Sequence, residues 1–160
     1  MTKEEYISGV EQWADGVLRF VMRCGSGRPE AEDAVQEAYA RLWQRHDAVP
    51  SEKGRAFLMT VAYRYAMSRF RHAKVEQSHA EAWADEASCH PAEQLEQREA
   101  IEWALRRLPT EQKALLQLRD VEGFSYKEMA DMLQLSEQQV QVYLFRARVA
   151  MRKMLQKLGY

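Results

Sequence analysis

Two helix starts lie close together near the carboxyl end of the chain, and they constrain the fold more than any other feature. Ser125 is followed three positions later by Glu128, and Ser136 is followed in the same way by Gln139. Each pair is a capping box, in which the serine hydroxyl and the later side chain each accept a hydrogen bond from an orphan backbone amide. Only a short corner at Gln134 separates the two helices. The pattern is typical of a helix-turn-helix.

A plain helical bundle also contains capped helix pairs, but the charge pattern favours DNA binding. Residues 138–160 carry five basic residues and no acidic one. Val140, Leu144 and Ala147 recur at helical spacing and predict a core face. Glutamine and arginine can bond base edges, and lysine and arginine neutralise phosphates. The candidate DNA-contact residues of this helix are Gln138, Gln141, Phe145, Arg146, Arg148 and Arg152.

The composition predicts an all-α protein with no membrane span. The chain has 160 residues, 46% of them hydrophobic, and its seven glycines and four prolines are too few for a turn-rich all-β fold. No apolar run reaches eighteen residues, and the first residues lack a signal-peptide core. We therefore expect a cytoplasmic protein. Cys24 and Cys89 are isolated, which favours reduced thiols over a disulfide framework.

Charge is distributed in blocks along the chain. Residues 53–75 carry six basic residues and no acidic one, like residues 138–160, whereas residues 1–52 and 76–137 are net acidic. Solvated helix faces usually mix both signs. Two cationic blocks held apart by acidic segments predict two separate contacts with a polyanion.

Helical periodicity predicts helices at residues 3–23, 29–46 and 52–74. In the second helix the core stripe is Ala34, Val35, Ala38, Tyr39, Leu42 and Trp43, and the opposite face carries Asp33, Gln36, Glu37, Ala40, Arg41 and Gln44. Small Ala40 leaves that face flat enough to dock on another surface. Spacing alone, however, favours an ordinary solvated face.

The third helix carries an acid-free outward face. Its predicted core residues are Phe57, Leu58, Val61, Ala62, Tyr65 and Ala66, and its outward residues are Thr60, Tyr63, Arg64, Met67, Arg71 and Lys74. Basic residues interleaved with an aromatic ring and a methionine suit single-stranded nucleic acid, whose backbone needs neutralising and whose bases need stacking surfaces. A surface patch without function is nearly as good an explanation for this helix alone.

Periodicity fails between residues 75 and 92, where acidic residues predict a flexible linker. His79, Cys89 and His90 lack a fourth ligand and a recognised spacing, so we predict no metal site. Beyond the predicted linker, helical spacing predicts a helix that ends at Pro109, with the apolar residues Leu95, Ile101, Ala104, Leu105 and Leu108. Thr110 is expected to cap a further helix that runs through Val121 and stops at Gly123.

Three stretches in this order resemble conserved parts of one protein family. Asp33 to Trp43 resembles region 2.2, Arg55 to Ala62 resembles region 2.3, and Leu108 to Arg148 resembles region 4 of group 4, or extracytoplasmic function (ECF), sigma factors of bacterial RNA polymerase. The resemblance implies two small helical domains, region 2 in residues 1–74 and region 4 in residues 93–160, joined by a flexible acidic linker at 75–92. It also implies a promoter-specificity subunit that is not itself an enzyme and uses no cofactor.

The resemblance implies three binding surfaces and their partners. The residues implied to contact the clamp helices of the polymerase largest subunit are Asp33, Gln36, Glu37 and Arg41. The residues implied to melt and hold the minus-ten element are Arg55, Tyr63, Arg64, Met67, Arg71 and Lys74. The helix after Ser136 reads the minus-thirty-five element. Further implied partners are the polymerase beta flap and an anti-sigma factor.

The chain departs from the family pattern at several of these positions. The family commonly has Trp, Asn and Asp where this chain has Phe57, Arg64 and Ser68. The sequence therefore does not predict which minus-ten bases are recognised. Gln134 stands where Gly is usual and is expected in a left-handed corner. Gln141 stands where a cation is usual, so readout is expected to rest on glutamine–adenine bonding together with arginine contacts.

Two other functions fit parts of the sequence. One is a helix-turn-helix regulator that binds DNA and acts without polymerase. The other is a helical adaptor whose partner is only another protein, and which has no salt-dependent affinity for DNA.

Overall fold

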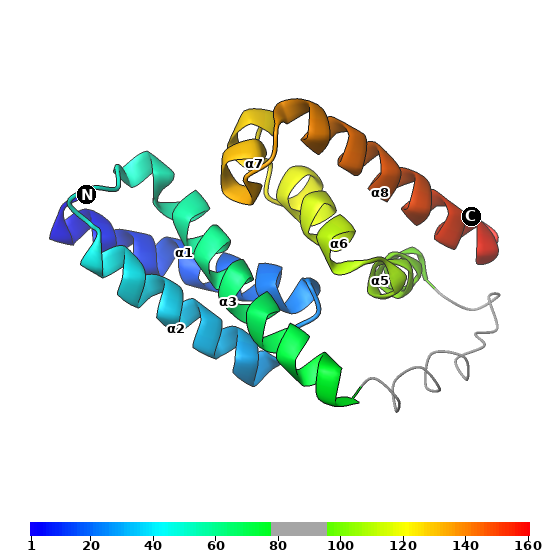
Figure 1. Ribbon diagram of the computed structural model, residues 1–160, viewed down its shortest axis with the longest axis horizontal. Coiled ribbons are helices and arrows are strands. Elements are labelled where there is room, and N and C mark those ends of the chain that lie inside the picture. Colours follow the sequence, from blue (N-terminus) through cyan, green and yellow to red (C-terminus); the bar gives the residue numbers. More distant parts are fainter. Residues whose placement is uncertain (78–95) are drawn as a thin grey trace.

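The structure is a computed structural model that describes residues 1–77 and 96–160, with side chains for residues 1–69 and 96–160. Within these ranges the chain is helical, without a strand, as predicted (Figure 1). The elements are α1 (Lys3–Arg23), α2 (Arg28–Gln44), the 3-10 helix η1 (Ser51–Lys53), α3 (Gly54–Gln77), α5 (Gln97–Arg107), α6 (Thr110–Leu116), the π-helix η3 (Gln117–Val121), α7 (Tyr126–Leu133) and α8 (Glu137–Lys157). None of the described helices is both long and apolar enough to cross a membrane.

Helices α1, α2 and α3 pack against one another and form the amino-terminal part. The side chain of Thr2 accepts a hydrogen bond from the Glu5 amide and caps α1. Buried alanines on α2, among them Ala34 and Ala38, let the neighbouring helices approach closely. The hydroxyl of Tyr39 on α2 donates to the carbonyls of Gly9 and Val10 on α1, at 3.2 and 3.3 Å, and fixes this pair of helices.

The buried face of α3 is rotated relative to the prediction. Met59 and Met67 are buried, whereas Phe57 and Val61 are only half-buried. The prediction that Met67 faces outward is therefore wrong. Helix α3 contacts α1, α2 and α7. These three neighbours cover more of its surface than the single core face that was predicted.

The helices of the carboxyl-terminal part, α5 to α8, include both predicted capping boxes. Ser125 accepts from the Glu128 amide at 3.1 Å and Ser136 accepts from the Gln139 amide at 3.0 Å. Between the helices Gln134 has φ 56°, the left-handed corner that the sequence predicted. Figure 1 shows the sharp turn from α7 into α8 that results.

Three details of this part differ from the prediction. Pro109, not Thr110, occupies the capping position of α6, and no side-chain cap bond forms there. The segment before Gly123 is the π-helix η3, which leaves Val121 54% exposed. Ile101 on α5 is also exposed. Regular helical spacing places Val121 and Ile101 in the core. The π-helix shifts the register at Val121, and the buried face of α5 is too narrow to include Ile101.

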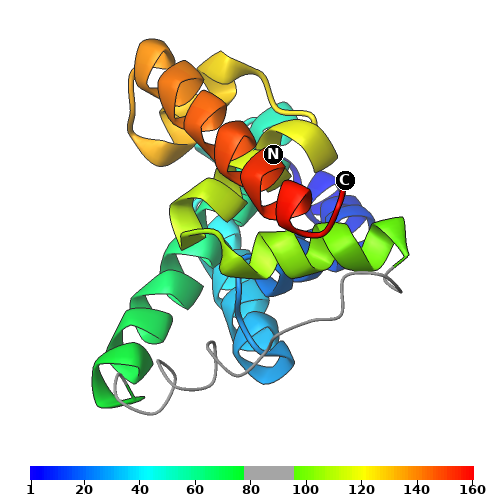
Figure 2. The same cartoon turned by 90° about the vertical axis from the view of Figure 1, so that its right-hand side faces the viewer.

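The two parts contact each other, and buried side chains from both belong to one hydrophobic cluster. Among the helices of the two parts, α3 and α7 share the most extensive contact. In both views α8 lies well apart from α2 (Figures 1 and 2). Of the predicted linker, residues 75–77 continue α3. Residues 78–92, with His79, Cys89 and His90, lie outside the described residues, as does Leu95.

Candidate nucleic-acid and polymerase interfaces

Helix α8 presents an exposed stripe of polar, basic and aromatic side chains. The stripe consists of Gln138, Gln141, Phe145, Arg148 and Arg152, all exposed. Val140, Leu144 and Ala147 are buried on the opposite face and hold the helix against the core. Phe145 is 67% exposed, although an aromatic ring of this size is usually covered. The Ser136 capping box sets the first turn of the stripe, so the whole face is fixed by local sequence and core packing.

One arginine of the stripe is held by a carboxylate from a neighbouring element. Nη2 of Arg148 donates to Oδ1 of Asp120 on η3 at 2.9 Å. This hydrogen bond raises the pKa of the Arg148 guanidinium. Asp120 therefore sets the direction of the Arg148 side chain.

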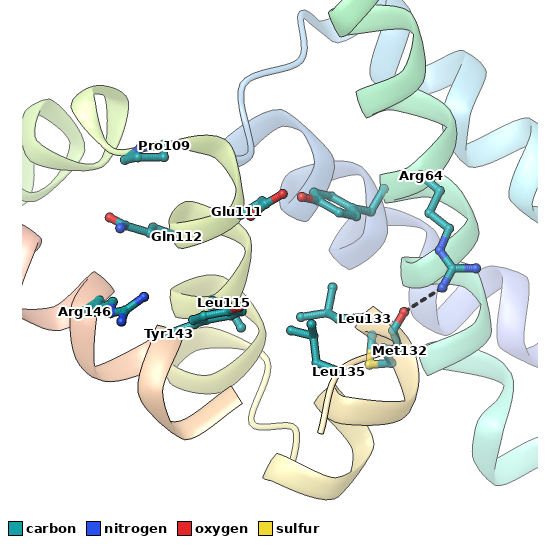
Figure 3. A pocket seen from close by; sticks show the side chains of 11 residues that line it. Arg64, Pro109, Glu111, Gln112, Leu115, Met132, Leu133, Leu135, Tyr143 and Arg146 are labelled. Carbon is teal, nitrogen blue, oxygen red and sulfur yellow. Dashed lines mark hydrogen bonds between the residues drawn. The ribbon is translucent and has the colours of Figure 1, made fainter. Parts of the chain in front are cut away.

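Arg146, the other predicted arginine of this helix, lies outside the stripe. Its guanidinium carbon is 5.9 Å from the centre of the Tyr143 ring. Both residues line a cavity of about 390 Å³ where α3, α6, α7 and α8 meet (Figure 3). Leu115, Leu133 and Leu135 give this cavity an apolar wall.

The predicted polymerase-binding residues lie together on α2. Asp33 and Gln36 are exposed, and Glu37 and Arg41 form an ion pair of 2.8 Å. Asp33 lies 3.6 Å from Arg69 of α3. Since these side chains are well exposed, the pairs are weak and open to exchange with another protein. The surface can therefore present carboxylates to a cationic partner.

Trp43 was predicted in the core, but it is 41% exposed. Its ring stacks on His46 at 4.4 Å and lies 5.0 Å from the Tyr6 ring. The His46 ring is thus stacked on the indole and the tilted Tyr6 ring lies against it, while the rest of the side chain stays exposed. It adds an aromatic surface near the carboxyl end of α2, which the sequence did not reveal.

The predicted minus-ten residues on α3 do not form one open surface. Arg55 and Arg64 are bonded to the carboxyl-terminal part, and Met67 is buried. Tyr63 is half-buried, with its ring centre 6.1 Å from that of Phe20. The side chains of Arg71 and Lys74 lie outside the described residues.

A metal centre has no support in the part of the chain with described side chains, since no cluster of three ligand-type residues occurs there. Cys24 is buried and unpaired, and burial raises the pKa of its thiol to about 12. A thiol that is neutral and enclosed is a poor nucleophile and a poor metal ligand. Cys24 is therefore a core residue.

Taken together, a helix-turn-helix and an exposed stripe of polar, basic and aromatic side chains on α8 are typical of a helical DNA-binding protein. Comparisons with known proteins agree. Residues 10–75 match the family model "Sigma-70 region 2" and residues 98–151 match "Sigma-70, region 4". The "ECF RNA polymerase sigma factor SigL" of Mycobacterium tuberculosis is 29% identical over 155 residues, which cover 93% of this chain and 88% of that protein. The "RNA polymerase sigma-H factor" of Pseudomonas aeruginosa is 26% identical over 160 residues, covering 89% and 81% of the two chains.

Two solved structures share the fold. The sigma factor RpoE of Bartonella quintana, in complex with the anti-sigma factor NepR, gives a TM-score of 0.74 at 21% identity, covering 96% of this chain and 98% of that one. CnrH, in complex with the cytosolic domain of CnrY, gives 0.69 at 19% identity, covering 98% and 90%. The chain belongs to the sigma-70 family, in its ECF group. It is a promoter-specificity subunit of bacterial RNA polymerase, a factor of transcription initiation.

Proposed function

We propose that three separate surfaces of this chain carry out promoter-specific initiation. The face of α2 binds the clamp helices of the largest polymerase subunit, α3 holds the minus-ten element, and the stripe on α8 reads the minus-thirty-five element. The stripe on α8 is the observation that carries the proposal. Its exposed Gln141 and Phe145 lie above a fully buried core face, in the geometry of a recognition helix.

On α8 the side chains divide between base reading and phosphate binding. Gln138 and Gln141 lie in the first turns of the helix and can bond base edges, adenine above all. Phe145 offers apolar contact for a thymine methyl group. Arg148 and Arg152, farther along, are placed for the phosphate backbone.

On α3 the proposed role is to bind the opened strand. Holding a flipped base and its flanking phosphates favours single-stranded over duplex DNA. The free energy gained offsets the few kcal/mol that unstacking costs. The chain needs no catalytic group for this step, and we propose that it is not an enzyme itself.

On α2 the carboxylates of Asp33 and Glu37 face outward beside Gln36. They are complementary to a basic surface, and the polymerase clamp helices are the proposed partner. The beta flap is the proposed partner of the carboxyl-terminal part. We place region 2 in residues 1–74, the linker in 75–92 and region 4 in 93–160, in a cytoplasmic protein.

An anti-sigma factor is a further proposed partner. The sigma factor RpoE was solved together with the anti-sigma factor NepR, and its fold matches nearly the whole of this chain. By analogy, an anti-sigma factor that binds this chain is expected to hold it inactive.

A paired substitution on α2 tests the polymerase surface. The double variant Gln36→Ala with Glu37→Ala should lose affinity for core polymerase and lose transcription, while duplex DNA binding by α8 is retained. The matched control is Glu11→Ala with Gln12→Ala, an exposed pair of the same two residue types on α1. Unchanged promoter-directed transcription in the α2 variant would instead favour a regulator that acts without polymerase.

A further inference from the structure

Asp33 of α2 forms an ion pair with Arg69 of α3. Its Oδ2 lies 3.6 Å from Nη1 of Arg69. This separation is too long for a good hydrogen bond, so the pair depends on charge and not on a fixed geometry. The side chain of Asp33 is 59% exposed and that of Arg69 is 56% exposed. An exposed pair of this kind is weak, and a better-placed cation can replace Arg69 beside the carboxylate.

The other carboxylate of the proposed polymerase face has a partner on its own helix. Nε of Arg41 donates to Oε1 of Glu37 at 2.8 Å, one turn away on α2. Opening that pair leaves both charges on α2. Opening the pair of Asp33 and Arg69 leaves an uncompensated cation on α3, the helix proposed to hold the minus-ten element. Asp33 therefore contributes to one proposed surface and pairs with a cation of the helix that carries another.

Arg69 has a second contact, which lies within α3. The carbon of its guanidinium is 4.7 Å from the centre of the Tyr65 ring, one turn earlier on the helix. A cation at this distance from an aromatic ring is attracted to it. Tyr65 is half-buried, which gives the cation a firm surface to lie on. Because this contact does not involve Asp33, it can keep Arg69 against α3 after the ion pair opens.

The counter-charge of Arg69 comes from outside its own basic block. Residues 53–75 carry six basic residues and no acidic one, so the carboxylate of Asp33 offsets part of the positive charge of α3. The Debye length at physiological salt is about 8 Å, not far below the helix diameter of about 10–12 Å. A cation released on α3 therefore adds to the attraction for phosphates near this helix, whether or not it touches them.

We propose that Arg69 is a positioning residue that holds Asp33 in the free protein and is displaced when polymerase binds, so that polymerase binding makes α3 more cationic and favours the opened DNA strand. The proposal rests on the proposed functions of α2 and α3. A cation of the polymerase takes the place of Arg69 beside Asp33. The two events favour each other by the same factor, because coupling between two binding sites is reciprocal.

Replacement of Arg69 by an uncharged residue tests the proposal, because it should change two steps in opposite directions. Arg69→Gln leaves Asp33 without a competitor, so affinity for core polymerase should rise about two- to fivefold, the size of an exposed ion pair. The assembled holoenzyme then lacks the released cation. Its affinity for a fluorescein-labelled forked promoter with a single-stranded minus-ten segment should fall by a similar factor. Both changes should shrink as the salt concentration rises.

Two further variants separate this role from charge in general and from stability. Arg28→Gln removes the same charge from an exposed pair on α2, where Nε of Arg28 lies 3.0 Å from Oε1 of Glu32. It accounts for the long-range effect of losing a cation. Arg69→Lys keeps the charge and should remain close to the wild type at both steps. A purely structural role of Arg69 would weaken both steps together.

The outcomes distinguish this proposal from the proposed function. Equal effects of Arg69→Gln and Arg28→Gln, or weaker polymerase binding by Arg69→Gln, would overturn the role of Arg69 while the wild type still directs initiation. Tighter polymerase binding with unchanged affinity for the forked promoter would overturn the link between the two surfaces. A wild type that does not bind core polymerase would overturn the proposed function as well. Opposite changes at the two steps, beyond those of the control and absent in Arg69→Lys, support the proposal.

Discussion

Arg148 on α8 and Asp120 on η3 are joined by a hydrogen bond of 2.9 Å, which places a carboxylate at the edge of the proposed recognition stripe. Both side chains are nearly half exposed, so the pair contributes little to stability, about 1 kcal/mol or less. We expect its main effect on DNA binding, because the Arg148 guanidinium would have to leave Asp120 or bind Asp120 and a phosphate together.

Asp120→Asn is therefore expected to strengthen duplex binding several-fold. The substitution removes a negative charge near the phosphates and frees Arg148. Fluorescence anisotropy with a duplex that carries a mapped minus-thirty-five element measures the effect, with Asp15→Asn on α1 as the matched control. A weaker complex would show instead that Asp120 positions Arg148 for its contact.

Leu144 and Phe145 are neighbours on α8 with opposite environments, 1% and 67% exposed. Leu144→Ala should lower the free energy of unfolding by about 2–5 kcal/mol, because it leaves a cavity in the core. Phe145→Ala should leave stability almost unchanged and weaken duplex binding. Urea unfolding and anisotropy separate the two effects, and similar unfolding midpoints for both variants would contradict the assignment of faces.

Gln141 and Arg152 should differ in the kind of binding they supply. Gln141→Ala is expected to cost about 1–3 kcal/mol at one base pair and to relax specificity there. Arg152→Ala should weaken all duplexes alike and reduce the slope of log K against log salt by about 1. Titrations of matched and mismatched duplexes at several salt concentrations check both. An unchanged salt slope for Arg152→Ala would argue against a phosphate contact.

Alkaline pH should destabilise the amino-terminal part through two buried groups. Burial raises the pKa of Tyr39 from 10.0 to about 12 and that of Cys24 from 9.0 to about 12. Both neutral forms are favoured in the folded state, so their contribution is complete below the unfolded pKa. It is lost as pH rises, from about 9 for Cys24 and about 10 for Tyr39 towards 12, at up to about 1.4 kcal/mol per pH unit for each group.

Urea unfolding in steps of pH tests this dependence. Tyr39→Phe should be less stable than the wild type at pH 8, by about 0.5–1.5 kcal/mol, because it loses the hydroxyl bonds to α1. Above pH 10 its stability should fall less steeply. Identical slopes in the two proteins would mean that Tyr39 does not titrate as proposed.

Features written in short stretches of sequence could be predicted. The two capping boxes depend on residues three positions apart, and both form as expected. The left-handed corner at Gln134 was expected from the resemblance, because the family usually has Gly at this position, and Gln134 has φ 56°. The all-α fold and the exposed stripe on α8 follow from helical spacing in the same way.

Features that depend on distant partners could not be predicted. Arg55 and Glu122 are 67 positions apart, and no local spacing indicates that they meet. The burial of Met67 depends on how many helices surround α3. Trp43 shares the helical spacing of the core residues of α2. It lies at the end of that helix, however, and contacts the rings of His46 and Tyr6 instead of the core. Helical spacing predicts which residues share one face of a helix, and the packing of neighbouring helices decides how deeply that face is buried.

Initiation by core polymerase tests the central claim most directly. Genomic DNA fragments are transcribed by core polymerase with and without the protein, and new start sites are mapped. The account predicts new starts that share two upstream elements, one for α3 and one for the stripe on α8. The contradicting result is a protein that binds DNA while core polymerase gains no initiation.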